Sequence, residues 1–395
     1  MAAALDLETF KNHFTGIMIY DPISRDTLYR LNSDKYFTPA SNTKIFTLYT
    51  SLVLLPKQVP ALKYCYVKDT LFVEGTGDPS LLHPYFKDST VTRFLKGYKN
   101  ISLNQNNFAD SRFGPGWAWE DYDGYYSPER SALPLYGNVV TISFSDTLNA
   151  SPDFFKENII LVNNARQREP DTNTFYFDPT RKDTLEIPFK ADTILVKKLL
   201  EAALGTKISS VQKMPCEKKM ILPGILTDSI NKRMMQESDN FLAEQLLLLA
   251  SSTLSDTLNT EIAIAHMLEN HLKDLKQPPR WVDGSGLSRY NLFSPESMVY
   301  VLNAMYREVP KERLLNLFAE GGVSGTVADW YPGNPNSYIY AKTGTLGNNH
   351  NISGYLITKS GKTLIFSFMN NHFTIPSSEI KKQMQLVFEW IRDHN

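Results

Sequence analysis

Two segments near the start of the chain have the β-branched and aromatic pattern that is typical of strands. They cover residues 15–20 and 27–31, and the turn signal Asp21-Pro22-Ile23-Ser24 separates them. A helix is predicted next, over residues 41–54. Its apolar residues recur at the 3.6-residue spacing of a core-facing stripe, at Ile45, Leu48, Tyr49 and Leu52.

The stretch from about residue 66 to 215 has a different pattern. Gly, Asp, Asn and Pro clusters separate short β-type runs, at 70–73, 101–103, 139–144, 159–162, 174–177 and 185–189. One helix is predicted at 193–204, capped by Asp192 and ended by Gly205. Gly75-Thr76-Gly77-Asp78-Pro79 precedes no helix, so it is interpreted as a tight turn rather than a phosphate loop. This stretch is therefore predicted to be a mostly-β module.

The rest of the chain is mainly helical until a final meander. Helices are predicted at about 225–237, 241–250, 256–274 and 295–307. Strands follow within 337–345 and at 352–358 and 363–368, and a last helix at 378–393 buries Ile380, Met384, Val387, Phe388 and Ile391.

Strands at both ends of the chain with helices between them favour one sheet closed by the two termini. We therefore predict an α/β (α+β) fold with a central antiparallel sheet flanked by helices and an inserted mostly-β domain. The predicted domains are residues 1–65 with 216–395, and the insertion 66–215. Cys65 and Cys216 lie where the chain leaves and re-enters, and we expect them to be near each other. Two unrelated buried thiols remain an alternative.

Composition excludes several classes of function. The 395 residues carry a net charge of −1, which gives no electrostatic case for nucleic acid or an anionic membrane. There is no apolar run of about 18 residues, so no membrane-spanning helix is expected. Two cysteines and seven histidines without ligand spacing predict no metal and no cofactor. The first residues have no export-signal pattern, which fits either a cytosolic protein or one whose signal has been removed.

Candidate chemistry begins at the start of the helix at 41–54. Ser41 and Lys44 are three residues apart, which places an amine beside a hydroxyl on one helix face. A neutral Lys44 can take the hydroxyl proton and make Ser41 a nucleophile. Alone the spacing is weak, because it recurs at Ser210–Lys213, Ser229–Lys232 and Ser378–Lys381.

Two further motifs follow in order, Ser238-Asp239-Asn240 before a buried helix and Lys342-Thr343-Gly344 in a strand. This ordered triple is the motif set of class A β-lactamases and penicillin-binding proteins. Burial and the second cation, Lys342, would lower the pKa of Lys44. Ser238 can relay a proton to the leaving amine, and Asn240 can hold the substrate amide.

The residue types at 342–345 also predict that this strand binds a carboxylate along its edge. Lys342 with the hydroxyls of Thr343 and Thr345 offers charge and donors to a terminal carboxylate, next to Gly344. Backbone N–H groups of Ser41 and Thr345 are the predicted oxyanion hole. For Thr345 the alternative is an ordinary β-branched strand residue.

Over nearly its whole length the chain resembles the penicillin-binding protein 4 family of D-alanyl-D-alanine carboxypeptidases and endopeptidases, peptidase family S13. Besides the triple, the resemblance rests on residues 77–81 (Gly-Asp-Pro-Ser-Leu), 116–121 (Gly-Trp-Ala-Trp-Glu-Asp), 283–289 (Asp-Gly-Ser-Gly-Leu-Ser-Arg) and 325–327 (Gly-Thr-Val). The separation of 197 positions between Ser41 and Ser238 (238 − 41) leaves room for the family's inserted module.

The resemblance implies a β-lactamase/transpeptidase-like fold and a periplasmic or exported serine enzyme. Such an enzyme cleaves the D-Ala–D-Ala bond of peptidoglycan stem peptides, can cut cross-links, and is acylated by β-lactam antibiotics. The insertion is shorter than in larger members, and Asn104 stands where the family often has an Asp that grips the substrate's side-chain amine. A β-lactamase and a non-catalytic peptidoglycan or antibiotic sensor are the alternatives.

Overall fold

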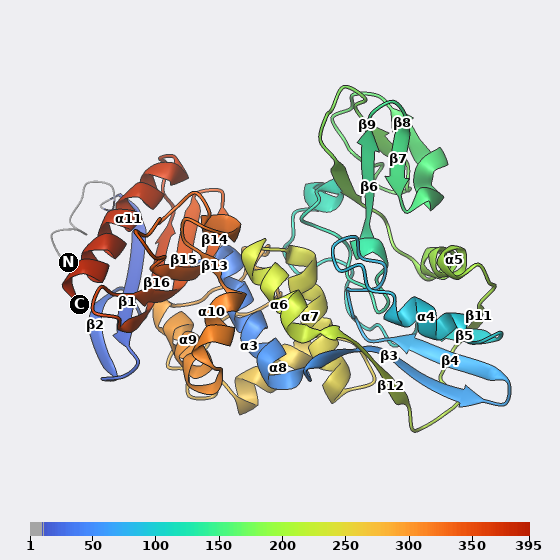
Figure 1. Cartoon of the computed structure of the whole chain (residues 1–395), viewed down its shortest axis with the longest axis horizontal. Coiled ribbons are helices and arrows are strands. Elements are labelled where there is room, and N and C mark those ends of the chain that lie inside the picture. Colours follow the sequence, from blue (N-terminus) through green and yellow to red (C-terminus); the bar gives the residue numbers. More distant parts are fainter. Residues whose placement is uncertain (1–9, 11) are drawn as a thin grey trace. The chain divides into compact units, whose positions relative to one another are not determined.

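The computed structural model describes residue 10 and residues 12–395 (Figure 1). The chain forms two compact units, each of which is described by itself. Unit 1 comprises residues 1–53, 228–243 and 264–395, and unit 2 comprises residues 54–227 and 244–263. The domain division predicted at 65/66 and 215/216 stays a prediction.

Unit 1 is built on a six-stranded sheet with the order β13-β14-β15-β16-β1-β2. All five strand pairs are antiparallel. Its N-terminal strand β1 pairs with β16 near the other end of the chain (Figure 1). The predicted closure of one sheet by both termini is therefore confirmed. The strands are β1 (Phe14–Asp21), β2 (Asp26–Leu31), β13 (Ala319–Glu320), β14 (Ile339–Leu346), β15 (Asn349–Ile357) and β16 (Thr363–Asn371).

Helices cover both faces of this sheet, because alternate residues of each strand point to opposite sides. Ile17, Phe368 and Ile352 form one cross-strand row, which packs in the same hydrophobic core as α11 (Ser377–His394). The opposite face meets α9 (Pro295–Glu308), where the Tyr355 hydroxyl donates to the Leu302 carbonyl at 2.8 Å. The five apolar residues predicted to be buried on α11 are all buried.

The predicted helix at 41–54 begins with a tighter turn than expected. Ala40–Thr43 form the 3-10 helix η1, and the α-helix α3 runs from Lys44 to Leu54. Such turns are frequent at helix N-termini, and Ser41 and Lys44 still share a face. The other helices that lie wholly or partly in unit 1 are α6 (Thr227–Gln236), α7 (Asn240–Leu254), α8 (Thr260–Asn270), α10 (Lys311–Leu317) and the 3-10 turn η5 (Gly325–Val327).

Unit 2 contains three small sheets, with strand orders β11-β5-β4-β3-β12, β10-β6-β7 and β8-β9. As predicted, its helix α5 (Thr193–Leu204) is capped by Asp192, whose side chain accepts from Leu195 N, and ends at Gly205. The structure adds that Gly205 has the left-handed conformation. The other elements are β3 (Gln58–Val67), β4 (Thr70–Gly75), β5 (Ile101–Asn104), β6 (Val139–Phe144), β7 (Leu148–Ser151), β8 (Ile159–Leu161), β9 (Phe175–Phe177), β10 (Leu185–Pro188), β11 (Ser209–Val211), β12 (Met220–Leu226), α4 (Thr90–Lys96) and the 3-10 turns η2 (Trp119–Asp123), η3 (Tyr136–Asn138) and η4 (Asp153–Asn158).

Strands β3, β7, β11 and β12 of unit 2 were not predicted. No strand was predicted at 58–65, and residues 225 and 226 were assigned to a helix, but β3 pairs with β12 across this region. Prolines normally occur in sheets at edges or irregularities. Here Pro60 lies opposite Pro223 where the register shifts, so neither proline interrupts the rest of the ladder.

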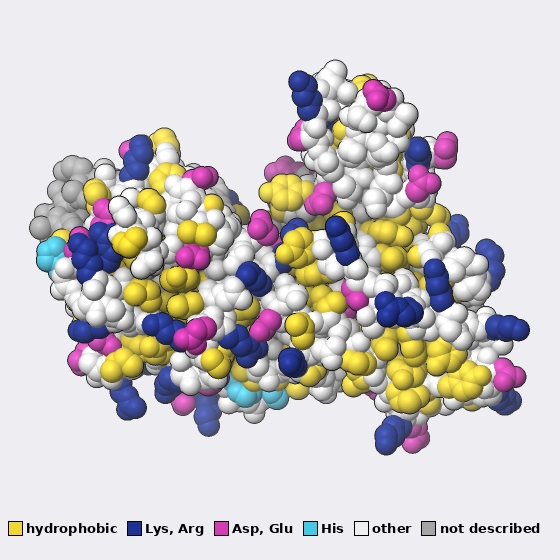
Figure 2. All heavy atoms as spheres, in the orientation of Figure 1, with side chains coloured by type: hydrophobic (Ala, Val, Ile, Leu, Met, Phe, Trp, Pro, Cys, Tyr) yellow, Lys and Arg dark blue, Asp and Glu magenta, His cyan; other side chains and the backbone are white. Residues whose placement is uncertain are grey.

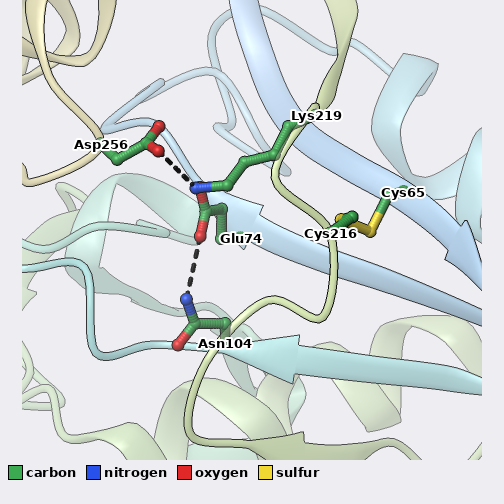
Figure 3. Close-up of a disulfide and its surroundings, with 6 residues drawn as sticks. All are labelled: Cys65, Glu74, Asn104, Cys216, Lys219 and Asp256. Carbon is green, nitrogen blue, oxygen red and sulfur yellow. Dashed lines mark hydrogen bonds and ion pairs between the residues drawn. A yellow bond between two sulfur atoms is a disulfide. The ribbon is translucent and has the colours of Figure 1, made fainter.

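Cys65 and Cys216 form a disulfide, with their Cα atoms 6.6 Å apart. The expected proximity of these cysteines is confirmed. A polar cluster lies beside the bond (Figure 3). Its centre is Lys219 Nζ, which is 2.6 Å from Glu74 Oε1 and 3.0 Å from Asp256 Oδ2. The disulfide and this cluster connect β3, β4 and the segment that leads into β12.

The surface of unit 2 also exposes apolar side chains. Figure 2 shows hydrophobic side chains gathered over β3, β4 and β12. On these strands, Tyr66 of β3 and Ile221 of β12 have 52% and 56% of their surface exposed. Within the described part of the chain, no helix is both long and apolar enough to cross a membrane.

Candidate active site

Ser41 and Lys44 are in hydrogen-bond contact, as the sequence predicted. Lys44 Nζ lies 2.9 Å from Ser41 Oγ. Lys44 is fully buried, whereas Ser41 is partly exposed. This is the arrangement in which an amine can remove the proton of a hydroxyl that a substrate can reach.

Two further groups hold the Lys44 amine. Its Nζ lies 2.7 Å from Asn240 Oδ1 and 2.7 Å from the carbonyl oxygen of Ser285. Asn240 was predicted as a site residue, whereas the Ser285 carbonyl was not. Both of these acceptors are neutral, so they orient the amine without adding a negative charge.

Asn240 is placed by the start of α7. Asp239 accepts a hydrogen bond from Leu242 N at 3.0 Å, which caps the helix. Burial raises the pKa of Asp239, although the hydrogen bond from Leu242 and the charge of Arg233 oppose this. Ser238 has a φ of 59°, an uncommon left-handed conformation for serine. The Ser-Asp-Asn motif is therefore a cap followed by the first residue of a helix.

Lys342 of β14 reaches the second motif. Its Nζ lies 2.8 Å from Ser238 Oγ and 2.7 Å from the carbonyl oxygen of Thr343. Burial, and then the charge of Lys44, lower the pKa of Lys342 well below its ordinary value. The neutral form of this lysine is thus favoured much more than in water.

Backbone packing brings β14 against η1. The Asn42 side chain donates to the Lys342 carbonyl at 3.1 Å. Gly344 approaches the backbone so closely that a Cβ there would overlap the Pro39 carbonyl oxygen. The glycine of the Lys-Thr-Gly motif is therefore needed for packing of the strand against the nucleophile's turn.

The loop at 283–289 also packs against the turn that carries Ser41. Asp283 accepts hydrogen bonds from Gly286 N at 2.8 Å, Ser288 N at 2.7 Å and Asn291 Nδ2 at 2.7 Å. Gly286 has a φ of 80°, and a Cβ there would overlap the Ala40 carbonyl. This folded loop presents the Ser285 carbonyl to Lys44. The sequence contributed these residues as a motif but did not predict their contacts.

The hydroxyls of Thr343 and Thr345 have separate partners. Thr343 Oγ1 lies 2.6 Å from Thr326 Oγ1, and Thr345 Oγ1 lies 2.8 Å from His350 Nδ1. Neither Thr326 nor His350 was predicted as a site residue. Thr326 belongs to the Gly-Thr-Val segment, whereas His350 had no signal, because only strand pairing brings it opposite Thr345. The oxyanion hole from the N–H groups of Ser41 and Thr345 stays a prediction.

Asn104 belongs to unit 2. It is buried, and its Nδ2 donates to Glu74 Oε2 at 2.9 Å (Figure 3). Its amide group is therefore engaged within the polar cluster around Lys219.

Comparison with known proteins agrees with this geometry. The model of the D-Ala-D-Ala carboxypeptidase 3 (S13) family matches residues 1–211 and 225–390. The chain belongs to this family. The resemblance identified from the sequence is thus confirmed, and the chain is a serine peptidase of the D-Ala-D-Ala carboxypeptidase type.

Individual members of the family are distant in sequence. The D-alanyl-D-alanine carboxypeptidase DacB of Haemophilus influenzae is 24% identical, over 90% of this chain and 85% of that protein. A penicillin-sensitive carboxypeptidase A of Dictyostelium discoideum is 22% identical, over 92% of this chain and 83% of that protein.

The fold is also that of a solved family member. The crystal structure of penicillin binding protein 4 from Haemophilus influenzae matches with a TM-score of 0.76 at 18% identity, covering 100% of this chain and 99% of that one. The predicted fold class, an antiparallel sheet flanked by helices within an α+β protein, is confirmed.

Proposed function

We propose that this serine DD-peptidase cleaves the terminal D-Ala–D-Ala bond of peptidoglycan stem peptides through an acyl-enzyme on Ser41. The observation that carries the proposal is the 2.9 Å contact between Lys44 Nζ and Ser41 Oγ. The same amine also donates to Asn240 Oδ1. A buried amine held by neutral acceptors is suited to act as a base when it is uncharged.

The reaction proceeds in two halves. Neutral Lys44 takes the proton of Ser41, and Oγ attacks the carbonyl carbon of the penultimate D-Ala. The N–H groups of Ser41 and Thr345 stabilise the resulting oxyanion. When the C–N bond breaks, the departing D-Ala amine takes a proton that Ser238 relays. Water then hydrolyses the ester, which releases the shortened peptide and restores the Ser41 hydroxyl.

Substrate recognition is assigned to β14 and the start of α7. Lys342 and the hydroxyls of Thr343 and Thr345 bind the terminal carboxylate, and Asn240 holds the substrate amide. A cross-linked peptide presents the same type of amide bond, so endopeptidase cleavage uses the same steps.

β-Lactam antibiotics are proposed as covalent inhibitors of the same site. A β-lactam offers a carbonyl to Ser41 and a carboxylate to the Lys342 edge, and it leaves an ester on Oγ. One relative is itself described as penicillin-sensitive.

We also place the enzyme in the periplasm or another exported location. The Cys65–Cys216 disulfide supports this placement, because disulfides persist in oxidising compartments. Peptidoglycan, the proposed substrate, lies in the same location.

The test is release of D-Ala from a stem peptide ending in D-Ala–D-Ala. We expect Ser41→Ala to lower the rate at least about 10³-fold, because the nucleophile is lost. Ser229→Ala is the matched control, since Ser229 is an exposed serine in another Ser-x-x-Lys sequence. It should retain wild-type activity.

Fluorescent penicillin distinguishes the alternatives in the same proteins. A stable adduct on wild type that Ser41→Ala lacks supports the proposal. Rapid turnover of the penicillin without D-Ala release would indicate a β-lactamase. Peptide binding with neither adduct nor D-Ala release would indicate a sensor and contradict the proposal.

A further inference from the structure

His350 and Thr345 form a pair at the proposed carboxylate edge. They lie directly opposite each other on β15 and β14, and Thr345 Oγ1 is 2.8 Å from His350 Nδ1. Thr345 is exposed, whereas His350 has only 1% of its surface exposed. The hydroxyl can therefore meet a substrate, and the imidazole can act only through the hydroxyl.

The His350 imidazole is uncharged near neutral pH. Burial, followed by the charges of Lys381 and Lys342, lowers the pKa of His350 to about 3. Two further neighbours are polar but uncharged: Asn370, which lies opposite His350 on β16, and Thr345 itself. The ring thus carries one proton, on Nδ1 or on Nε2.

Burial distinguishes the two tautomers. Among the described residues, Nε2 of His350 has no hydrogen-bond partner. A proton on Nε2 would leave a buried N–H without an acceptor, which is rarer and less favourable than an unfilled lone pair. A proton on Nδ1 instead donates to Thr345 Oγ1, and Nε2 keeps only its lone pair.

The tautomer decides what Thr345 can offer a ligand. A threonine hydroxyl has one hydrogen. If that hydrogen were donated to His350, the oxygen lone pairs would face an incoming carboxylate and repel it. If His350 donates instead, the hydrogen is free to bind the carboxylate, and such a charge-assisted bond is strong.

We propose that His350 is a positioning residue, whose Nδ1–H donates to Thr345 Oγ1 and so keeps the Thr345 hydroxyl hydrogen for the terminal carboxylate of the substrate. This inference rests on the proposed function. According to this inference, the buried His350 contributes to the preference of the site for peptides that end in a free carboxylate.

The first test compares two substrates, a D-Ala–D-Ala peptide and the same peptide with a terminal amide. We expect His350→Phe to lower kcat/KM for the free acid about tenfold, mainly through KM, because a bond to the carboxylate is lost in ground and transition states alike. For the peptide with the terminal amide, His350→Phe should change kcat/KM by less than about twofold. His350→Asn, whose side-chain amide can still donate, should recover part of the loss.

Two comparisons separate positioning from a structural effect. In a Thr345→Val background, His350→Phe should add no further loss, because the hydroxyl that it orients is absent. His271→Phe, which replaces an exposed histidine directly after α8, should leave kcat/KM for both substrates unchanged. Equal losses for acid and amide would overturn the inference.

The second test reads the tautomer directly and needs no substrate. ¹⁵N NMR of the wild-type protein, with the His350 signals assigned by their loss in His350→Asn, should show the proton on Nδ1. It should stay there from about pH 8 down to about pH 5. A proton on Nε2 overturns the inference even if His350→Phe does not fold.

The two proposals fail differently. A wild-type enzyme that releases D-Ala with Ser41, but whose acid-to-amide preference does not depend on His350, contradicts only the role of His350. A wild-type protein that releases no D-Ala contradicts the proposed function and this inference with it.

Discussion

Units 1 and 2 each contain a lysine held by polar partners, but its pKa is shifted in opposite directions in the two units. In unit 2, burial lowers the pKa of Lys219, but hydrogen bonds to Glu74 and Asp256 outweigh this and raise it overall. In unit 1, burial and the charge of Lys44 lower the pKa of Lys342, whose acceptors Ser238 Oγ and Thr343 O are neutral.

The difference separates a structural lysine from a chemical one. Lys219 joins elements of unit 2 by ion pairs next to a disulfide, so its charge contributes to stability (Figure 3). Lys342 is held where its charge is unfavourable, and under the proposed function an incoming carboxylate would offset this cost. Under that proposal unit 1 gives up stability for binding, whereas unit 2 gains stability from its ion pairs and its disulfide.

Replacing Lys342 should have the largest effect. We expect Lys342→Met to lower kcat/KM for D-Ala release about 10²–10⁴-fold, since the carboxylate loses its cation. The free energy of unfolding should fall by no more than about 1 kcal/mol, because a buried, unfavourable charge is removed as well. Kinetics and urea denaturation of the same preparation measure both quantities.

Lys219→Met is the matched control in unit 2. It leaves the carboxylate of Glu74, which is 1% exposed, without its cation. The free energy of unfolding should fall by about 2–3 kcal/mol, with D-Ala release retained. If both lysine variants lost stability equally, the contrast between the two units would be wrong.

Removing the disulfide should have the next largest effect. The bond closes a sequence separation of 151 residues within unit 2. We expect Cys65→Ser/Cys216→Ser to lower the free energy of unfolding by about 2–4 kcal/mol, because the unfolded chain gains freedom. Differential hydrogen exchange should locate the loss in unit 2, and a loss spread equally over β14 and β15 of unit 1 would contradict this.

The smallest expected effect is a pH dependence of the free energy of unfolding, caused by a buried carboxyl of unit 2. Burial raises the pKa of Asp78 to about 6, although hydrogen bonds from Ser80 oppose the rise. The protonated form is favoured in the folded state. Its contribution to the free energy of unfolding is therefore complete below about pH 4 and is lost as pH rises through about 6.

Asp78→Asn should remove this dependence while keeping an acceptor for Ser80. Between about pH 4 and pH 7, the wild type should lose about 1–3 kcal/mol more than the variant. Urea denaturation at both pH values measures the difference. Parallel stability curves for the two proteins would exclude Asp78 as the source.

Local sequence signals predicted the elements that depend on nearby residues. The apolar stripe of α11, the cap at Asp192 and the end of α5 at Gly205 were all predicted. Each is set within one or a few turns of helix, where periodicity and propensity act directly. The three ordered motifs likewise predicted that Lys44, Asn240 and Lys342 belong to one site, although their roles in the reaction stay predictions.

Distant pairing determined what the sequence left open. β3 and β12 form a ladder around two prolines because residues far apart in the chain meet there, and no local pattern at 58–65 predicts that partner. The Ser285 carbonyl reaches Lys44 through backbone, which has no residue-type signature. His350 acquires its contact with Thr345 from strand register alone. By itself the sequence determined which side chains are available for the chemistry, whereas the tertiary structure decided which atoms hold them, because hydrogen bonds and burial depend on neighbours that only folding brings together.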